Sequence, residues 1–271
     1  MKNSISIKWQ ILRHGVEKYL AKNFEIFVPS SGGSAKILGF HTKICINLVF
    51  PLLSKLLSVY SPIKEIQSAE YFCKKRKKFN EANKLKFYFN KYKSDKSLNH
   101  NYHLIYGALF PDTNKVKKIL EIGLGTNNEK LISNMGKNGS PGASVRAFRD
   151  FFKNASIFGA DIDKKILFKE NRIKTFYVDQ TNINSLEKLY KKTKNNFDLI
   201  IDDGLHAPYT NLNFIITGIT KIKKGAWLIV EDIPFKTKPI WEIVSFIINT
   251  KQKSFLIKTK NCYIFLINKI R

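Results

Sequence analysis

The 271-residue sequence contains little arginine for so basic a protein. Its formal net charge is +26 at pH 7, yet only six of its 47 basic residues are arginines. Arginine makes bidentate contacts with phosphates and reads base edges, whereas an AT-rich genome enriches lysine, asparagine and isoleucine everywhere. The composition therefore disfavours nucleic acid as the partner. Attraction to an anionic substrate or to a membrane surface stays open.

Cysteines are also few, and no apolar run stays uncharged over the length of a membrane span. Cys45, Cys73 and Cys262 show neither disulfide nor metal-ligand spacing, which indicates free thiols in a reducing compartment. The N-terminus lacks the continuous apolar segment of a signal peptide. Residues 37–60 are apolar but include two lysines and a proline, whereas a spanning helix needs about 20 largely uncharged residues. We expect a cytoplasmic protein in which this segment forms a packed helix pair, with peripheral membrane contact as the weaker alternative.

Acidic residues are the minority, 21 against 47 basic ones, but four of them directly follow two apolar segments. Asp202, Asp203 and His206 follow the apolar run 197–201, and Glu231-Asp232 follows 226–230. The carboxyl ends of neighbouring parallel strands converge on one crevice, where ligands bind. Carboxylates crowded there repel one another unless a cation lies among them. The spacing predicts a metal site, and oxygen donors without cysteine favour Mg²⁺ over Zn²⁺.

Strand-like and helix-like segments alternate from residue 116 onward. The expected strands are 116–122, 156–160, 175–178, 197–201 and 226–230, followed by a terminal hairpin of 255–257 and 262–267. The expected helices between them are 143–152 and 186–193. This alternation predicts an α/β fold with a doubly wound, mostly parallel, seven-stranded sheet. Residues 1–92 are expected to form a basic, helical N-terminal extension, and residues 93–271 the ligand-binding domain.

A glycine turn after the first expected strand indicates a nucleotide-like ligand. Gly123 and Gly125 let the backbone approach a ligand closely, but Asn128 stands where a dinucleotide fingerprint needs its third glycine. Glu121 before the turn would serve a pyrophosphate poorly, while a cationic sulfonium with an ammonium group would tolerate it. The pattern therefore suits S-adenosylmethionine better than NAD.

Acids also end the next two expected strands. Asp161 is placed to accept hydrogen bonds from ribose hydroxyls, and Asp179 to meet the adenine amino group. A strand-end aspartate often only caps the following helix, so each acid alone is weak support, while three at successive strand ends are more specific. Asp202 is ambiguous, because it would either hold its own loop or line the cofactor pocket.

At this point the chain resembles class I methyltransferases similar to the macrolide-sugar O-methyltransferases of mycinamicin and tylosin biosynthesis. The segments that carry the resemblance are 120–123, 142–148, 159–163, 178–180, 201–206 and 230–232, with 94–106 as a further match. The expected contacts of S-adenosylmethionine are Glu121, Gly123, Gly125, Ser144, Asp161, Asp179, Gln180 and Asp202. The resemblance implies a Rossmann-like fold and a Mg²⁺ site formed by Asp203, Glu231 and Asp232. It also implies that His206 is the general base.

We therefore expect a Mg²⁺-assisted O-methyltransferase that acts on a sugar or polyol hydroxyl of a glycan or glycosylated metabolite. The loop 126–139 is longer than the family's usual turn, and about the first ninety residues match nothing in it. One alternative is an RNA methyltransferase that uses the basic N-terminal region. Another is a non-catalytic binding module, against which the intact acidic cluster argues. A homo-oligomer is left open.

Overall fold

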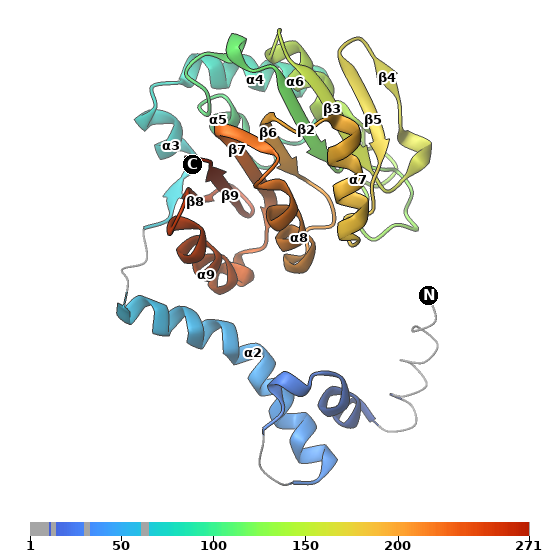
Figure 1. The fold of residues 1–271 in the computed structure, drawn as a ribbon, viewed down its shortest axis with the longest axis vertical. Coiled ribbons are helices and arrows are strands. Elements are labelled where there is room, and N and C mark those ends of the chain that lie inside the picture. Colours follow the sequence, from blue (N-terminus) through green and yellow to red (C-terminus); the bar gives the residue numbers. More distant parts are fainter. Residues whose placement is uncertain (1–10, 12–14, 30–32, 61–64, 271) are drawn as a thin grey trace. The chain divides into compact units, whose positions relative to one another are not determined.

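The chain divides into two compact units, residues 1–63 and residues 64–271 (Figure 1). The structure, a computed structural model, describes residues 11, 15–29, 33–60 and 65–270. The larger unit holds a mixed sheet covered by helices on both faces. The smaller unit is helical in its described part.

Nine strands form the sheet in the described part of the chain, in the order β1-β8-β9-β7-β6-β2-β3-β5-β4. They are β1 (Gln67–Ser68), β2 (Lys118–Ile122), β3 (Ser156–Asp161), β4 (Lys169–Glu170), β5 (Ile173–Tyr177), β6 (Phe197–Asp202), β7 (Ile222–Ile233), β8 (Lys253–Lys258) and β9 (Tyr263–Asn268). The pairings from β7 through β6, β2 and β3 to β5 are parallel, and β8–β9 is the expected antiparallel hairpin. The predicted count of seven was wrong. It missed β1 and β4, which are two residues each and too short to show a period of two.

Seven helices accompany these strands in the described part of the larger unit. They are α3 (Ala69–Lys75), α4 (Phe79–Lys91), α5 (His103–Tyr106), α6 (Ala143–Phe151), α7 (Ile183–Thr193), α8 (Pro208–Gly218) and α9 (Lys238–Asn249). The 3₁₀ turns there are η2 (Thr113–Lys115), η3 (Lys164–Ile166) and η4 (Phe235–Thr237). The Asn182 side chain caps the first turn of α7, and Pro208 begins α8, where its missing N–H costs nothing.

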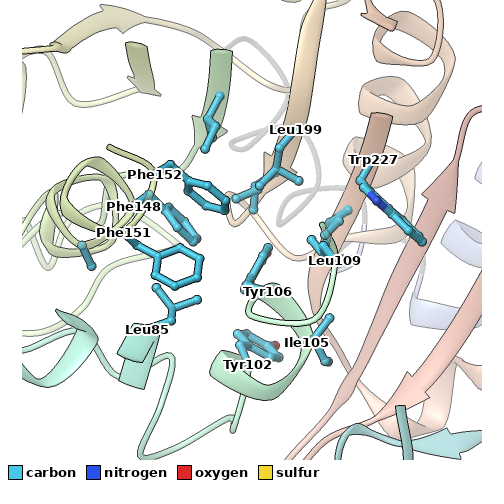
Figure 2. Packing of buried hydrophobic residues seen from close by; sticks show 14 of the residues in the cluster. Leu85, Tyr102, Ile105, Tyr106, Leu109, Phe148, Phe151, Phe152, Leu199 and Trp227 are labelled. Atoms are coloured by element: carbon cyan, nitrogen blue, oxygen red, sulfur yellow. The ribbon is translucent and has the colours of Figure 1, made fainter. Parts of the chain in front are cut away.

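Alternation along the central strands sorts apolar side chains into two cores. Leu199 and Trp227 face the core built with α3 to α6, whereas Ile200 and Leu228 face the core built with α7 to α9. Figure 2 shows the first of these cores, in which Phe148 from α6 lies near Tyr106 from α5. Because successive strand residues point to opposite faces, the continuous apolar runs of the sequence fill both layers.

The helices α3 and α4 belong to the larger unit, so the boundary predicted at residue 92 is placed too late. Phe72, Leu85 and Phe89 are almost completely buried in the first core. Their apolar spacing is hidden in the sequence by the many lysines on the outer faces of the same helices. The division of the chain therefore falls near residue 63.

The basic run 74–78 is only partly a solvated helix face. Arg76 donates to the Ala108 carbonyl at 3.3 Å, and its guanidinium lies 4.4 Å from the Phe72 ring centroid. Lys78 forms an ion pair with Glu81 at 2.7 Å. Two of these five basic groups thus have partners inside the fold, which weakens the reading of the run as an RNA-binding surface.

In the smaller unit, residues 15–23 are helical, η1 spans Glu25–Phe27, and α2 spans Ala35–Tyr60. The expected helix pair is therefore wrong, because α2 is one helix with Pro51 inside it. An interior proline removes one backbone donor, yet the helix continues past Pro51 to Tyr60. Among the described residues, α2 is the one helix long and apolar enough to cross a membrane, by length and composition only.

We predict that His103 makes the fold sensitive to mild acid. It is 8% exposed, and burial lowers the pKa of its imidazole to about 4, assisted by Lys86 and Lys260. Since an unfolded histidine titrates near pH 6.5, the unfolded state binds a proton that the folded state refuses as the pH falls from about 6.5 to 4. Urea titrations at pH 7 and 4.5 should therefore show an acid loss of unfolding free energy smaller by about 2 kcal/mol in His103→Gln.

The exposed His41 provides the control for this experiment. A His41→Gln variant should lose stability with acid as the wild type does. An identical acid loss in His103→Gln would show that the buried imidazole is not the acid-sensitive group.

Candidate active site

A cavity of about 750 Å³ lies at the carboxyl ends of β2, β3, β5, β6 and β7. The chain runs from β2 outward through β3 to β5 on one side, and continues through β6 and β7 on the other. The strand order therefore reverses between β2 and β6, which is the point where open α/β sheets bind ligands. The lining includes ten of the twelve residues predicted to bind the cofactor, hold the metal or act as the base.

The turn after β2 needs glycine for two reasons: the conformation of its backbone, and the closeness of the backbone after β6. Gly123 has φ +95°, and a Cβ there would lie 1.8 Å from the Asp203 carbonyl oxygen. The Asp203 N–H also donates to the Ile122 carbonyl at 2.8 Å. The loops after β2 and β6 thus touch along their backbones, which brings the cofactor turn beside the acidic cluster.

Gly125 is packed under the long loop 126–139. Its φ is +75°, and a Cβ would lie 1.9 Å from the Met135 sulfur. The Ser133 hydroxyl donates to the Gly204 carbonyl at 2.8 Å. The long loop is therefore tied to the loop after β6, and it contributes residues 130–135 to the cavity lining.

Asp161 ends β3 and lines the cavity with a carboxylate oriented by two backbone groups. The Leu124 N–H donates to Oδ2 and the Asp163 N–H to Oδ1, each at 2.8 Å. Burial raises the pKa of the Asp161 carboxyl, and these bonds oppose that shift. Each oxygen can still accept from a ligand, so the geometry is compatible with the predicted ribose contact.

Asp179 and Gln180 follow β5 and also line the cavity. Asp179 Oδ1 accepts from the Thr181 N–H at 2.9 Å and from the Thr181 hydroxyl at 2.7 Å, so it holds the turn after β5, while Asn182 caps α7. Gln180 donates to Asp202, and its Oε1 accepts from the Leu205 N–H at 3.0 Å. Gln180 therefore connects the end of β5 to the loop after β6.

Asp202 does not line the cavity. It is fully buried, and it accepts from Gln180, from the Gly204 N–H at 3.2 Å and from the Asn211 amide at 2.9 Å. Of the two roles left open for Asp202, the structure shows the one that holds the loop. Direct cofactor contact is not what this geometry provides.

Glu121 also lies beneath the cavity rather than in its lining. Its Oε2 accepts from the Ser144 hydroxyl at 2.7 Å, and its Oε1 lies 3.1 Å from Lys96 Nζ. Ser144 lines the cavity at the start of α6. Glu121 thus contacts Ser144 and Lys96, and its contact with the cofactor stays a prediction.

Lys96 is a buried cation at the centre of the acidic cluster. Only 2% exposed, its ammonium lies 2.6 Å from Asp203 Oδ2 and bonds to Glu231 Oε2 as well as pairing with Glu121. Burial lowers the pKa of this ammonium, but the three carboxylates outweigh burial and hold the pKa well above its ordinary value. The repulsion expected among the carboxylates is thus relieved in part by the chain itself.

Two tyrosines of the same segment hold the acidic pair of β7. The Tyr106 hydroxyl donates to Glu231 Oε1, and the Tyr102 hydroxyl donates to Asp232 Oδ1 at 2.5 Å. Burial raises the pKa of both phenols well above the ordinary range, so they remain protonated donors. Both oxygens of Glu231 are therefore occupied, one by Lys96 and one by Tyr106.

Asp203, His206 and Asp232 form an open group at the cavity wall. His206 Nε2 lies 4.0 Å from Asp203 Oδ1 and 3.8 Å from Asp232 Oδ2, and each side chain is 25–29% exposed. His206 and Asp232 have φ values of +55° and +52°, a left-handed conformation that costs non-glycine residues about 1–3 kcal/mol and clusters at functional sites. Burial raises the pKa of Asp232, but His206 and His100 outweigh it and lower that pKa.

This open group fits a divalent cation, although not with the full ligand set expected. One ligand atom from each of Asp203, His206 and Asp232 lies within 4.8 Å of the others, and carboxylate oxygens suit Mg²⁺. Lys96 pairs with the carboxylates of Glu121, Asp203 and Glu231, so one buried ammonium balances only part of the charge that this acidic cluster can carry. Glu231, the third ligand implied by the resemblance, is engaged by Lys96 and Tyr106 in this arrangement.

Lys96 and Tyr106 are the site residues that sequence reasoning missed. Lys96 is one of many lysines, and a buried lysine carries no mark in a sequence that is basic everywhere. Tyr102 and Tyr106 are four residues apart, a spacing that places both on one side of a short helix. That spacing alone does not say which face of the domain the helix meets.

No known protein-family model matches the chain, but several curated proteins do. Over 150 residues it is 27% identical to 8-demethyl-8-alpha-L-rhamnosyl tetracenomycin-C 2'-O-methyltransferase of Streptomyces olivaceus, covering 55% of this chain and 37% of that protein. Over 120 residues it is 28% identical to mycinamicin VI 2''-O-methyltransferase of Micromonospora griseorubida, covering 44% and 28%. The match thus covers only 37% and 28% of the length of these two relatives.

Solved structures show which fold the chain has. The MycE methyltransferase of mycinamycin biosynthesis, in complex with Mg and SAH, superimposes with a TM-score of 0.57 at 21% identity, over 69% of this chain and 55% of that one. The chain has the fold of a class I methyltransferase. The predicted Rossmann-like fold and the resemblance to the macrolide-sugar O-methyltransferases are confirmed. The role of each residue within this methyltransferase fold stays a prediction.

We predict that Lys96 competes with divalent cations for the acidic cluster. Lys96→Met keeps the side-chain length but removes the buried charge, and breaking a buried ion pair from one side costs about 3–5 kcal/mol. The melting temperature should fall. Mg²⁺ should raise it more in the variant than in the wild type, because oxygens of Asp203 and Glu231 become available. Thermal unfolding with and without Mg²⁺ measures both effects.

Lys118→Met is the matched control, because the Lys118 ammonium is also internally bonded, to backbone carbonyls of Thr193 and Asn195. It should lose stability without gaining a response to Mg²⁺. An equal Mg²⁺ response in Lys96→Met and the wild type would contradict the competition.

Proposed function

We propose that this chain is an S-adenosylmethionine-dependent O-methyltransferase that acts on a sugar or polyol hydroxyl of a glycan or glycosylated metabolite. One observation carries the proposal. Asp203, His206 and Asp232 converge at the wall of a single cavity whose other side is the glycine turn and Asp161. The matched relatives, which are sugar O-methyltransferases by name, support the same choice of acceptor.

The cofactor side of the cavity is the edge formed by the ends of β2, β3 and β5. Gly123 allows close backbone approach, Asp161 offers two acceptor oxygens, and Gln180 and Ser144 complete the polar lining. A volume of about 750 Å³ is in the range of cofactor and small-molecule sites. It leaves room for an acceptor sugar next to the acidic wall.

The reaction is a direct displacement at the methyl carbon. The acceptor oxygen forms a bond to this carbon as the carbon–sulfur bond breaks, and S-adenosylhomocysteine leaves with the electron pair on sulfur. Alignment of oxygen, carbon and sulfur supplies much of the acceleration. His206 Nε2 accepts the hydroxyl proton, and the carboxylates of Asp203 and Asp232, 4.0 and 3.8 Å away, stabilise the resulting imidazolium.

Asp203 and Asp232 are also the residues that would hold a divalent cation. When bound, Mg²⁺ polarises the acceptor hydroxyl and lowers its pKa, and the presence of Mg in the MycE structures supports this cofactor. Lys96 and Tyr106 fix Glu231, and Tyr102 fixes Asp232, so the wall is preorganised before the acceptor arrives. The expected cytoplasmic location and an oligomeric state are separate predictions.

One test of the proposed function concerns the cofactor pocket. S-Adenosylhomocysteine should bind one to one with micromolar affinity in isothermal titration calorimetry. Asp161→Asn should weaken it about tenfold or more, because a hydrogen bond to a charged group contributes about 1.5–3 kcal/mol. Asp163→Asn is the control, since Asp163 lies two residues away but outside the cavity lining. A folded wild-type protein that binds no S-adenosylhomocysteine would overturn the proposed function.

The second prediction concerns the proton acceptor. His206→Ala should reduce methyl transfer to a rhamnosylated acceptor by about 10²–10⁴-fold, the usual contribution of a general base. Its affinity for S-adenosylhomocysteine should stay within about threefold, because His206 belongs to the acceptor side. Single-turnover transfer of labelled methyl, measured beside calorimetry, separates the two effects. Near-normal transfer in the variant would remove His206 from the catalytic role.

A further inference from the structure

The helix α2 presents an apolar stripe that the described residues of the smaller unit leave exposed. The large apolar side chains at 37, 40, 44, 48, 52, 56 and 59 are each 37–73% exposed. Spacings of three and four residues place them on one side of the helix. Contiguous apolar surface of this length is rare on soluble proteins and marks an interaction site.

The opposite side of α2 is the one that packs within the smaller unit. Gly39 is buried, and a Cβ there would lie 1.9 Å from the Glu17 carbonyl oxygen of the helical segment 15–23. Ile37 lies two residues away and is 56% exposed. At 3.6 residues per turn, two positions differ by roughly 200°, so around Gly39 the apolar stripe faces away from the packed side.

Charge on α2 is of one sign. The helix contains Lys36, Lys43 and Lys55 and has no acidic residue. The exposed side chains of Lys36, Lys43 and Asn47 are spaced by seven and four residues, so they share a narrow polar stripe beside the apolar one. Lys55 interrupts the apolar side, where its long stem can keep the ammonium in water. A partner of α2 must therefore be both apolar and anionic.

From this combination we infer that α2 binds the surface of an anionic lipid bilayer and lies in the interfacial plane. An apolar stripe next to lysines is the pattern of interfacial helices. The longest lysine-free stretch inside α2 is 44–54, which at 1.5 Å per residue is roughly 16 Å. A bilayer core is about 30 Å thick, so a transmembrane orientation would bury lysine charge. The inference does not depend on the methyltransferase chemistry.

Flotation of the full chain with vesicles tests the inference. Wild-type protein should bind vesicles of phosphatidylcholine with 30% phosphatidylglycerol about tenfold more than pure phosphatidylcholine vesicles, with less binding in high salt. Leu48→Asn/Leu52→Asn should reduce binding about tenfold or more without loss of fold. Ile216→Asn/Ile247→Asn, at two apolar positions of α8 and α9 that are more exposed than Leu48 and Leu52, should bind as the wild type does. Lys36→Gln/Lys43→Gln should lose the preference for the anionic lipid.

Three outcomes would overturn the inference. Equal binding by the α2 and the α8/α9 variants would mean that the stripe is not the contact. Protein that resists release from the vesicles by high salt and alkaline carbonate would be spanning rather than interfacial. A stripe-dependent dimer in sedimentation velocity, without vesicle binding, would assign the stripe to a second copy of the chain.

Discussion

The ion pairing of Lys96 is the interaction on which the rest of the site depends. One buried ammonium contacts carboxylates from three strands, Glu121 of β2, Asp203 after β6 and Glu231 of β7. Without it, the carboxyl ends of these adjacent strands would carry uncompensated buried charge, which is costly in a low-dielectric interior. Because Lys96 comes from the segment before β2, the same contact fastens that segment to the sheet. The acidic cluster therefore both lines the cavity and holds the segment before β2 against the sheet.

The four acids differ in which partners their carboxylate oxygens have. Glu231 and Glu121 are fully buried and paired with Lys96, and a hydroxyl of Tyr106 or Ser144 holds the other oxygen of each. Asp203 and Asp232 each turn one oxygen to a partner beneath, Lys96 or Tyr102, and the other toward His206. These two acids therefore remain available to a cation or to a protonated imidazole. The left-handed backbone at His206 and Asp232 is the local cost of presenting these groups.

The two units of the chain differ in how they treat their apolar residues. The larger unit buries its apolar residues in two layers about the sheet, with the cavity at the point where strand order reverses. The smaller unit keeps a long apolar stripe on α2 exposed while packing the opposite side at Gly39. A core explains the first arrangement, and the lipid binding that we infer would explain the second.

Much of the fold was determined by the sequence alone. Apolar runs ending in acids fix the strands, their alternation with helices fixes the parallel sheet, and the terminal runs fix the β8–β9 hairpin, because these patterns are local. The sequence did not predict three features. These are the two-residue strands β1 and β4, the burial of α3 and α4, and the continuity of α2 through Pro51. Pairing partners and core membership depend on contacts between distant segments, and lysines on the outer faces hid the apolar spacing.

For the site, the sequence determined which acids and which histidine meet, since all of them end neighbouring strands. Only the tertiary structure decided how they are used. It placed Glu121 and Asp202 beneath the cavity, assigned Glu231 to Lys96 and Tyr106, and left Asp203, His206 and Asp232 open. The reason is that burial and hydrogen bonding separate chemically identical carboxylates. Both depend on which side chain the rest of the fold brings to each oxygen.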